Sequence, residues 1–131
     1  MAEHYFQTTP LYYVNDRPHL GHAYSEVVSD ALSRWHRLIG DEVFFLTGTD
    51  EHGMKLARSA AEHDATPEAW VDGAQVWFRK AWESLECSND DFIRTTEPRH
   101  TESVGVFAQA IYDNGYIYKG TYTGLYAVVS E

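Results

Sequence analysis

The hydrophobic period of this chain changes at Gly21, and that change limits the folds open to it. Before Gly21 lie two short runs of aromatic and β-branched residues, 5–9 and 11–14, a pattern typical of buried strands. After Gly21, apolar residues recur at three- and four-residue spacing on one stripe, and Gly40 follows as a stop signal. The stripe consists of Tyr24, Val27, Val28, Ala31, Leu32, Trp35, Leu38 and Ile39. We therefore predict a strand followed by a long helix.

The rest of the chain continues this alternation. Thr66 and Pro67 have the residue types of a helix cap and a first helical position, and Asn114-Gly115 is expected to end the last helix with a left-handed cap. The order of elements favours a three-layer α/β fold with a parallel sheet. We expect helices at 54–62, 66–85 and 98–114, strands at 43–47 and 92–95, and a strand pair or hairpin within 116–131.

Composition narrows the class of protein. With 131 residues the chain suits one modest domain, and its net charge of −10 argues against a free-standing basic nucleic-acid binder. The one cysteine, Cys87, has no partner for an internal disulfide, and we expect it to be inert. The apolar runs are short, so neither a signal peptide nor a membrane span is predicted. These features indicate a cytoplasmic protein.

The segment "PHLGH" lies where the first predicted helix begins. In parallel α/β sheets, ligands bind beyond the carboxyl ends of the strands, and a helix start offers free N–H groups and partial positive charge. Gly21 allows a ligand close to the backbone, and the imidazoles of His19 and His22 can donate to phosphate oxygens. We predict a nucleoside triphosphate site, in which both histidines stabilise charge during attack on the α-phosphorus. Solvated helix caps are the alternative.

A second polar loop, "TGTDEHG", follows the next predicted strand. It should bring Asp50, Glu51 and His52 to the same sheet edge, where a carboxylate can bind an amino group or a ribose hydroxyl. A polar turn with a helix cap is the alternative. A metal site of His19, His22 and His52 is also conceivable, but the set lacks a cysteine and an H-E-x-x-H frame, so no metal is predicted.

Several other residues have ordinary structural explanations. The tryptophans lie at helical spacing on apolar stripes and are expected in the core or at an interface: Trp35, Trp70, Trp77 and Trp82. Arg94, Arg99 and His100 could contact a ligand or RNA, but salt-bridged or solvated roles are favoured.

Four stretches together resemble the methionyl-tRNA synthetases, a family of class I aminoacyl-tRNA synthetases: "TTPLYYVNDRPHLGHAY", "FFLTGTDEHG", "DDFIRTTEPRH" and "GYIYKGTYTGLYAVVSE". The resemblance implies that residues 1–115 form the first half of a Rossmann-like catalytic domain, an α/β parallel sheet with flanking helices. It also implies that residues 116–131 begin the connective-peptide insertion.

The resemblance implies a reaction as well. Methionine would be activated by ATP, with Mg²⁺ accompanying the nucleotide, to methionyl-adenylate, and then transferred to tRNA(Met). Matching position by position, His19, Gly21 and His22 would face ATP, with the two histidines as the catalytic pair. Pro10, Leu11 and Tyr13 would line one wall of the methionine pocket, and Asp50 would bind the methionine α-amino group. An apolar wall suits a thioether, and a carboxylate suits an ammonium.

The chain also departs from the family pattern. It has no K-M-S-K-S motif, second half-domain or anticodon-binding domain, so we expect an N-terminal fragment that is inactive and self-associating when isolated. Positions that hold zinc-binding cysteines in many relatives carry Ala127 and Ser130, so no zinc is predicted. Two alternatives remain open, a small H-x-G-H nucleotidyltransferase and a non-catalytic, synthetase-like interaction module.

Overall fold

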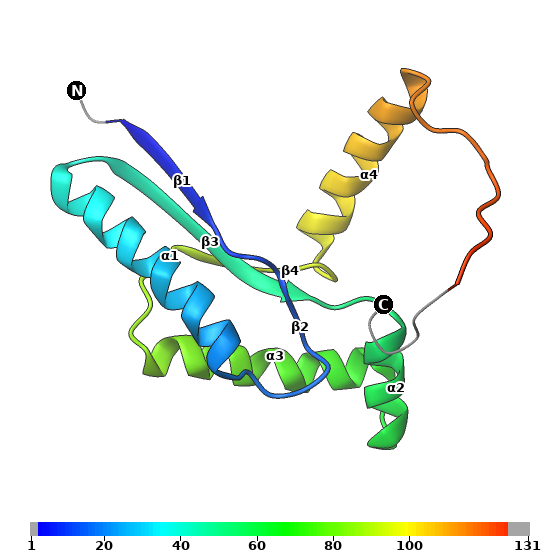
Figure 1. Ribbon diagram of the computed structural model, residues 1–131, viewed down its shortest axis with the longest axis horizontal. Coiled ribbons are helices and arrows are strands. Elements are labelled where there is room, and N and C mark those ends of the chain that lie inside the picture. Colours follow the sequence, from blue (N-terminus) through cyan, green and yellow to red (C-terminus); the bar gives the residue numbers. More distant parts are fainter. Residues whose placement is uncertain (1–2, 126–131) are drawn as a thin grey trace.

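The computed structural model describes residues 3–125 and contains a small parallel sheet with helices packed beside it (Figure 1). The strands are β1 (His4–Thr8), β2 (Tyr12–Tyr13), β3 (Glu42–Asp50) and β4 (Asp91–Arg94). The helices are α1 (Leu20–Ile39), α2 (Met54–Glu62), α3 (Pro67–Ser84) and α4 (Pro98–Asp113). The predicted strand–helix order is confirmed, as are the Thr66 cap of α3 and the left-handed Gly40 that ends α1.

Strand β3 is the centre of the sheet. β1 and β2 pair with successive parts of one of its edges, β4 pairs with the other, and all three pairings are parallel. The strand is longer than the predicted 43–47 because the polar residues Gly48, Thr49 and Asp50 continue its pairing with β2 and β4. A Cβ on Gly48 would lie 2.0 Å from the Ile93 carbonyl oxygen, so glycine is required here by close strand approach.

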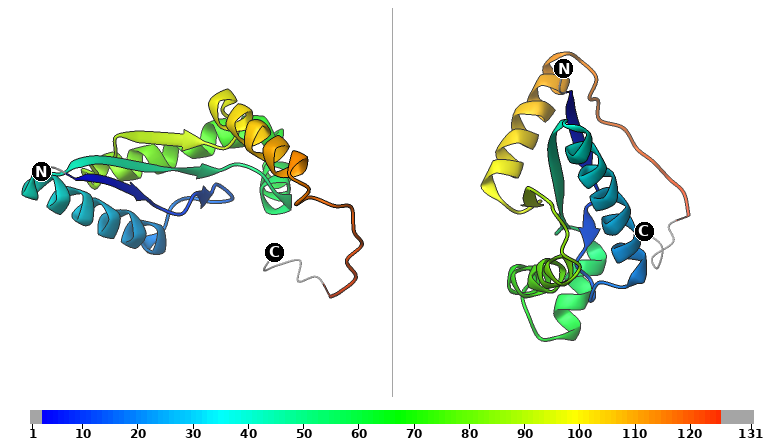
Figure 2. Two further views of the ribbon diagram at one scale, coloured as in Figure 1. Left: turned by 90° about the horizontal axis from the view of Figure 1, so that it is seen from above. Right: turned by 90° about the vertical axis from the view of Figure 1, so that its left-hand side faces the viewer.

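Both helices that pack on the sheet cover the same face. Thr47 on β3 contacts α1 through Glu26, whereas its register partner Phe92 on β4 packs with α3. Register partners in a parallel sheet point the same way, so α1 and α3 lie side by side (Figure 2). On the other face, the rings of Phe6 and Phe44 stack with centroids 5.7 Å apart and remain exposed. The expected third layer is therefore not found within residues 3–125.

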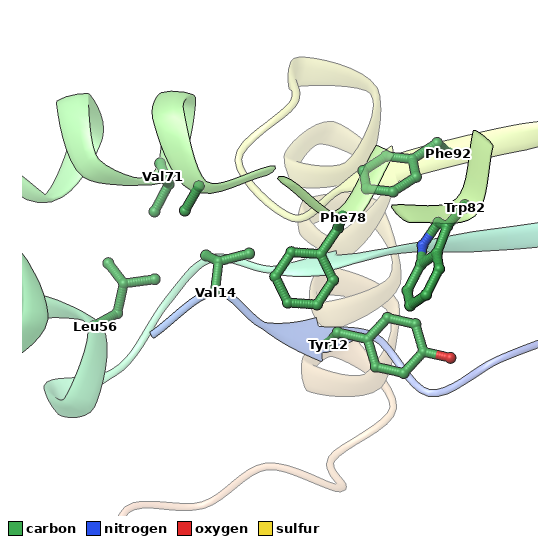
Figure 3. Packing of buried hydrophobic residues seen from close by; sticks show 8 residues of the cluster. Tyr12, Val14, Leu56, Val71, Phe78, Trp82 and Phe92 are labelled. Atoms are coloured by element: carbon green, nitrogen blue, oxygen red, sulfur yellow. The ribbon is translucent and has the colours of Figure 1, made fainter. Parts of the chain in front are cut away.

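The apolar core lies between α3 and the carboxyl ends of the strands (Figure 3). The ring of Tyr12 packs against Phe78 and Trp82 of α3, which places β2 directly on that helix. The buried members of the cluster are Tyr12, Val14, Leu56, Val71, Ala74, Phe78, Trp82 and Phe92. Trp70 and Trp77 are partly buried against it, so the interpretation of the α3 tryptophans as core residues is confirmed.

Helix α1 packs on the sheet through its polar side, which the sequence did not indicate. Its buried residues are Glu26, Ser29, Asp30 and Ser33. The apolar stripe faces outward, and Trp35 is 53% and Leu38 83% exposed, so of the two places expected for Trp35, the core or an interface, the core is excluded. The buried carboxylates have specific partners: Oε2 of Glu26 accepts from Tyr12 and Thr47 of the sheet, and Oδ1 of Asp30 accepts from Ser88 in the loop before β4.

Helix α4 projects away from the sheet and none of its residues is buried (Figure 1). Gly115 follows it with φ 75°, the left-handed conformation expected at this helix end. The predicted strand pair or hairpin is wrong for residues 116–125, which form neither helix nor strand. Residues 126–131, including Ala127 and Ser130, lie outside the described part of the chain.

Candidate functional site at the carboxyl edge of the sheet

The two histidines of the H-L-G-H segment cap helix α1. Nδ1 of His19 accepts from the Gly21 backbone N–H at 3.0 Å, and Nδ1 of His22 accepts from the His19 backbone N–H at 3.1 Å. The result is a reciprocal capping box, with the two rings stacked at a centroid distance of 3.9 Å. A Cβ on Gly21 would lie 2.9 Å from Cε1 of His19, so this glycine makes room for the capping ring.

This cap determines the tautomer of both imidazole rings. Because each Nδ1 accepts a backbone N–H, each neutral ring carries its proton on Nε2. Burial, followed by repulsion from His19, lowers the pKa of His22 and favours its neutral form. The stacked rings of His19 and His22 therefore offer two Nε2–H donors at the start of α1, where the helix dipole favours an anion.

The residues expected to contact the substrate methionine lie before this cap in the chain or on the neighbouring strand β3. Tyr12 and Tyr13 point to opposite faces of β2, with Tyr12 buried and Tyr13 52% exposed. Tyr13 is the register partner of Asp50, so these two side chains share the open face of the sheet. Pro10 is exposed and Leu11 is half-buried in the short connection between β1 and β2.

The histidine pair lies against Tyr12, whereas Asp50 pairs with Tyr13, the next residue, whose side chain points to the other face of β2. The His22 ring lies edge-on to Tyr12 at a centroid distance of 5.2 Å, and the next residue, Tyr13, pairs with Asp50. Both groups thus lie at the carboxyl edge of the sheet, although Asp50 is the last residue of β3 and does not belong to the following loop.

Glu51 forms a buried ion pair beneath this edge. Its side chain is 0% exposed, and Oε1 accepts from Nε of Arg94 at 2.8 Å and from the Thr49 hydroxyl at 2.8 Å. Arg94 also reaches Asp72 of α3, so the salt-bridged interpretation of Arg94 is confirmed. Arg99 likewise pairs with Asp91 and Glu97.

Two functional candidates were missed by sequence reasoning. Glu26 is buried under Tyr12, and burial raises its pKa, although hydrogen bonds from Thr47 and Tyr12 offset part of that effect. Thr95 is buried at the end of β4, and its hydroxyl contacts residues 50–52. The run "RTTE" contains Thr95, but nothing in its pattern indicates which threonine points inward.

Within residues 3–125, the structure contains no cluster of three His, Cys, Asp or Glu side chains suited to a metal ion.

Burial raises the pKa of Cys87 to about 11, so the thiolate is scarce at neutral pH, as expected for an inert cysteine. None of the helices in this part of the chain is long and apolar enough to cross a membrane.

Comparison with known proteins identifies the family. The family model described as tRNA synthetases class I (M) matches residues 5–131. The chain belongs to this family. Among its curated relatives, the methionine–tRNA ligase of Streptomyces coelicolor is 54% identical over 132 residues, and that of Rickettsia bellii is 51% identical over 131 residues. These alignments cover 99% and 100% of this chain.

The fold agrees with that of a solved class I synthetase. Mycobacterium tuberculosis methionyl-tRNA synthetase in complex with methionyl-adenylate superposes with a TM-score of 0.84 at 39% identity. The match covers 88% of this chain and 22% of that one, and confirms the expected Rossmann-like fold with a parallel sheet. This synthetase chain spans about a quarter of the length of its curated relatives, 24% and 26% in the two cases above.

Proposed function

We propose that this chain supplies the first half of the adenylate-forming site of a methionine–tRNA ligase. The reaction joins methionine to the α-phosphate of ATP, with Mg²⁺ accompanying the nucleotide, releases pyrophosphate, and then transfers methionine to tRNA(Met). The single observation that carries the proposal is the double-histidine cap at the start of α1, which follows β2 at the edge of the sheet where β3 ends with Asp50. The proposed location of the protein is the cytoplasm.

The proposed role of His19 and His22 follows from their hydrogen bonds. Each imidazole accepts from the backbone at Nδ1 and keeps an Nε2–H for the phosphate oxygens of ATP. Donors that are already oriented can stabilise the charge that develops during displacement of pyrophosphate, because no reorganisation is needed. Without a side chain, Gly21 leaves room for the His19 ring of the cap and would let the nucleotide come close to the backbone.

The proposed methionine site uses the open face of the sheet. The Asp50 carboxylate would bind the α-ammonium group, and Pro10, Leu11 and Tyr13 would contact the thioether side chain. In this proposal the methionine carboxylate would face the α-phosphorus of the ATP that the histidines bind. We further propose that residues 1–115 form the half-domain and that residues 116–131 begin a connective insertion, with no zinc bound by this segment.

Methionine-dependent exchange of pyrophosphate into ATP tests this function. In the full-length protein, exchange should require methionine and should fall about 100-fold in His22→Ala, the range expected for losing one oriented donor to a transition state. Exchange that ignores methionine but uses another acceptor would favour the small nucleotidyltransferase. Absence of exchange with all substrates saturating would favour the non-catalytic module.

A further inference from the structure

Thr95 contacts three successive polar residues, the last residue of the central strand and the two that follow it. Its Oγ1 accepts from the Glu51 backbone N–H at 2.9 Å, contacts Nδ1 of His52 at 3.0 Å, and donates to Oδ1 of Asp50 at 3.5 Å. Its own backbone N–H donates to the Thr49 carbonyl at 3.2 Å. Thr95 is 6% exposed, so these protein groups are its main partners.

The hydroxyl of Thr95 has a single proton, and its direction determines which neighbouring groups donate to this oxygen. A threonine hydroxyl has one proton to donate and two lone pairs to accept. If the proton points to Asp50, both lone pairs are used by the Glu51 N–H and by His52, which must then carry its proton on Nδ1. The opposite arrangement would turn an oxygen lone pair toward the Asp50 carboxylate and is disfavoured.

The surroundings keep Thr95 in this orientation. The next side chain, Thr96, donates to Oε2 of Glu51, and the preceding one, Arg94, donates to Oε1. Three successive residues from the end of β4 therefore contact the segment from Asp50 to His52. His52 itself is exposed, so with Nδ1 occupied its Nε2 lone pair is free toward solvent.

We propose that Thr95 is a positioning residue that orients the Asp50 carboxylate for the substrate ammonium group and holds His52 as its Nδ1–H tautomer. The first part rests on the proposed function of Asp50, and the second does not. The Thr95–Asp50 contact is the longest of the three, as is common for a catalytic hydrogen bond before a ligand tightens it. Removing the hydroxyl lets the carboxylate rotate and leaves the Glu51 N–H unpaired.

The matched variants are Thr95→Val, which keeps the shape, and Thr95→Ser, which keeps the hydroxyl. In the full-length protein, Thr95→Val should raise the KM for methionine about tenfold in pyrophosphate exchange, the effect of one lost hydrogen bond to a charged group. The KM for ATP and kcat should stay within about twofold, and Thr95→Ser should restore the KM for methionine. Thr101→Val is the control, because that hydroxyl bonds carbonyl groups at the start of α4.

A merely structural role would move all the kinetic constants together. The inference is overturned if Thr95→Val leaves the KM for methionine unchanged, if it raises both KM values equally, or if Thr95→Ser is as impaired as Thr95→Val. These outcomes are read only where the unmodified protein shows methionine-dependent exchange, whose absence would instead refute the proposed function.

The tautomer of His52 gives a second readout that needs no activity. Histidine-selective ¹⁵N NMR on the full-length protein, with the His52 signal identified by its loss in His52→Gln, should show Nδ1 protonated. Thr95→Val should move that signal toward the Nε2–H tautomer, and Thr95→Ser should not. An Nε2–H signal in the unmodified protein, or an unchanged signal in Thr95→Val, would overturn the inference whether or not the protein is active.

Discussion

The Tyr12 hydroxyl donates a hydrogen bond to Oε2 of Glu26, 3.1 Å away, and so joins strand β2 to helix α1 inside the protein. The Thr47 hydroxyl donates to the same oxygen at 2.8 Å. The hydroxyl oxygens of Thr9 and Thr47 are hydrogen-bonded at 2.9 Å. Because Thr47 uses its proton on Glu26, the Thr9 hydroxyl must be the donor in that last bond. A single carboxyl group thus connects β2 and β3 directly, and the residue after β1 through Thr47, to the helix that carries the histidines.

Removing the Tyr12 hydroxyl should therefore destabilise the fold. Oε1 of Glu26 is buried with no hydrogen-bond partner, so loss of a donor to Oε2 leaves the group still less satisfied. We expect Tyr12→Phe to lower the free energy of unfolding by about 1–2 kcal/mol, measured by urea denaturation. Tyr24→Phe is the control, because Tyr24 is 74% exposed. Equal effects of the two variants would show that the Glu26 bond contributes nothing.

The pH dependence of stability should also report on Glu26. Burial raises its pKa in the folded protein above the ordinary value of 4.5, so the folded state holds this proton more tightly than the unfolded chain does. Its stabilising contribution is complete below the unfolded pKa and is lost as pH rises through the folded pKa. The free energy of unfolding of the unmodified protein should therefore fall, relative to Glu26→Gln, from about pH 5 upward.

Urea denaturation curves of the unmodified protein and of Glu26→Gln between about pH 5 and pH 8 would measure this difference in the free energy of unfolding. The other buried carboxyl group of α1, Asp30, has the opposite pKa shift. Burial raises its pKa, but hydrogen bonds from Ser88 and Arg34 outweigh this and lower the pKa below 3.8. Its contribution is lost only at more acidic pH, outside the chosen window. Parallel curves for the two proteins would mean that Glu26 is already ionised in the fold.

Gly21→Ala should separate stability from activity. Alanine favours a helix by about 1 kcal/mol over glycine, but its Cβ would displace the His19 ring from the cap. We expect the free energy of unfolding to change by less than about 1 kcal/mol, because the lost cap offsets the gain in helix propensity. Pyrophosphate exchange by the full-length protein should fall at least about tenfold. Full activity in Gly21→Ala would show that the His19 cap has no catalytic importance.

Removing only one partner of the Glu51–Arg94 ion pair should strongly lower the free energy of unfolding. Arg94→Ala leaves a fully buried carboxylate without its cation, which costs about 3–5 kcal/mol. Replacing both partners, as in Glu51→Gln with Arg94→Met, should cost less than Arg94→Ala alone, as a double-mutant cycle in urea would measure. Arg99→Ala is the exposed control, expected to cost much less than Arg94→Ala because solvent screens its ion pairs. A similar cost for the two arginines would contradict the burial argument.

The outward apolar stripe of α1 should make the chain self-associate. Large apolar patches on a surface drive association, and Leu32 and Leu38 are 44% and 83% exposed. The double variant Leu32→Glu with Leu38→Glu should shift the purified 131-residue chain toward the monomer in sedimentation velocity, with unchanged helical circular dichroism. Thr101→Glu on α4 controls for added charge. A monomeric unmodified chain would show that this stripe does not drive association.

Prediction from sequence succeeded where the signal is local. The Thr66–Pro67 start of α3 and the left-handed Gly40 after α1 were found because cap chemistry depends on a few neighbouring residues. Strand β3 was predicted too short because Gly48 and Asp50 lack strand propensity, and their pairing with β4 and β2 keeps them extended. The expected hairpin is not formed by residues 116–125, because aromatic residues around glycines do not by themselves supply a pairing partner.

For the candidate site, the sequence alone determined the positions of His19, Gly21, His22 and Asp50 and the helix start that three of them share. Tertiary structure decided which side of α1 is buried, that Glu26 binds Tyr12, and that Thr95 meets Asp50 across the sheet. Caps and motifs depend on residues within one helical turn, whereas buried polar contacts join segments 14 to 45 residues apart. Their partners exist only once the strands have paired, because pairing removes water from these groups and makes each hydrogen bond necessary.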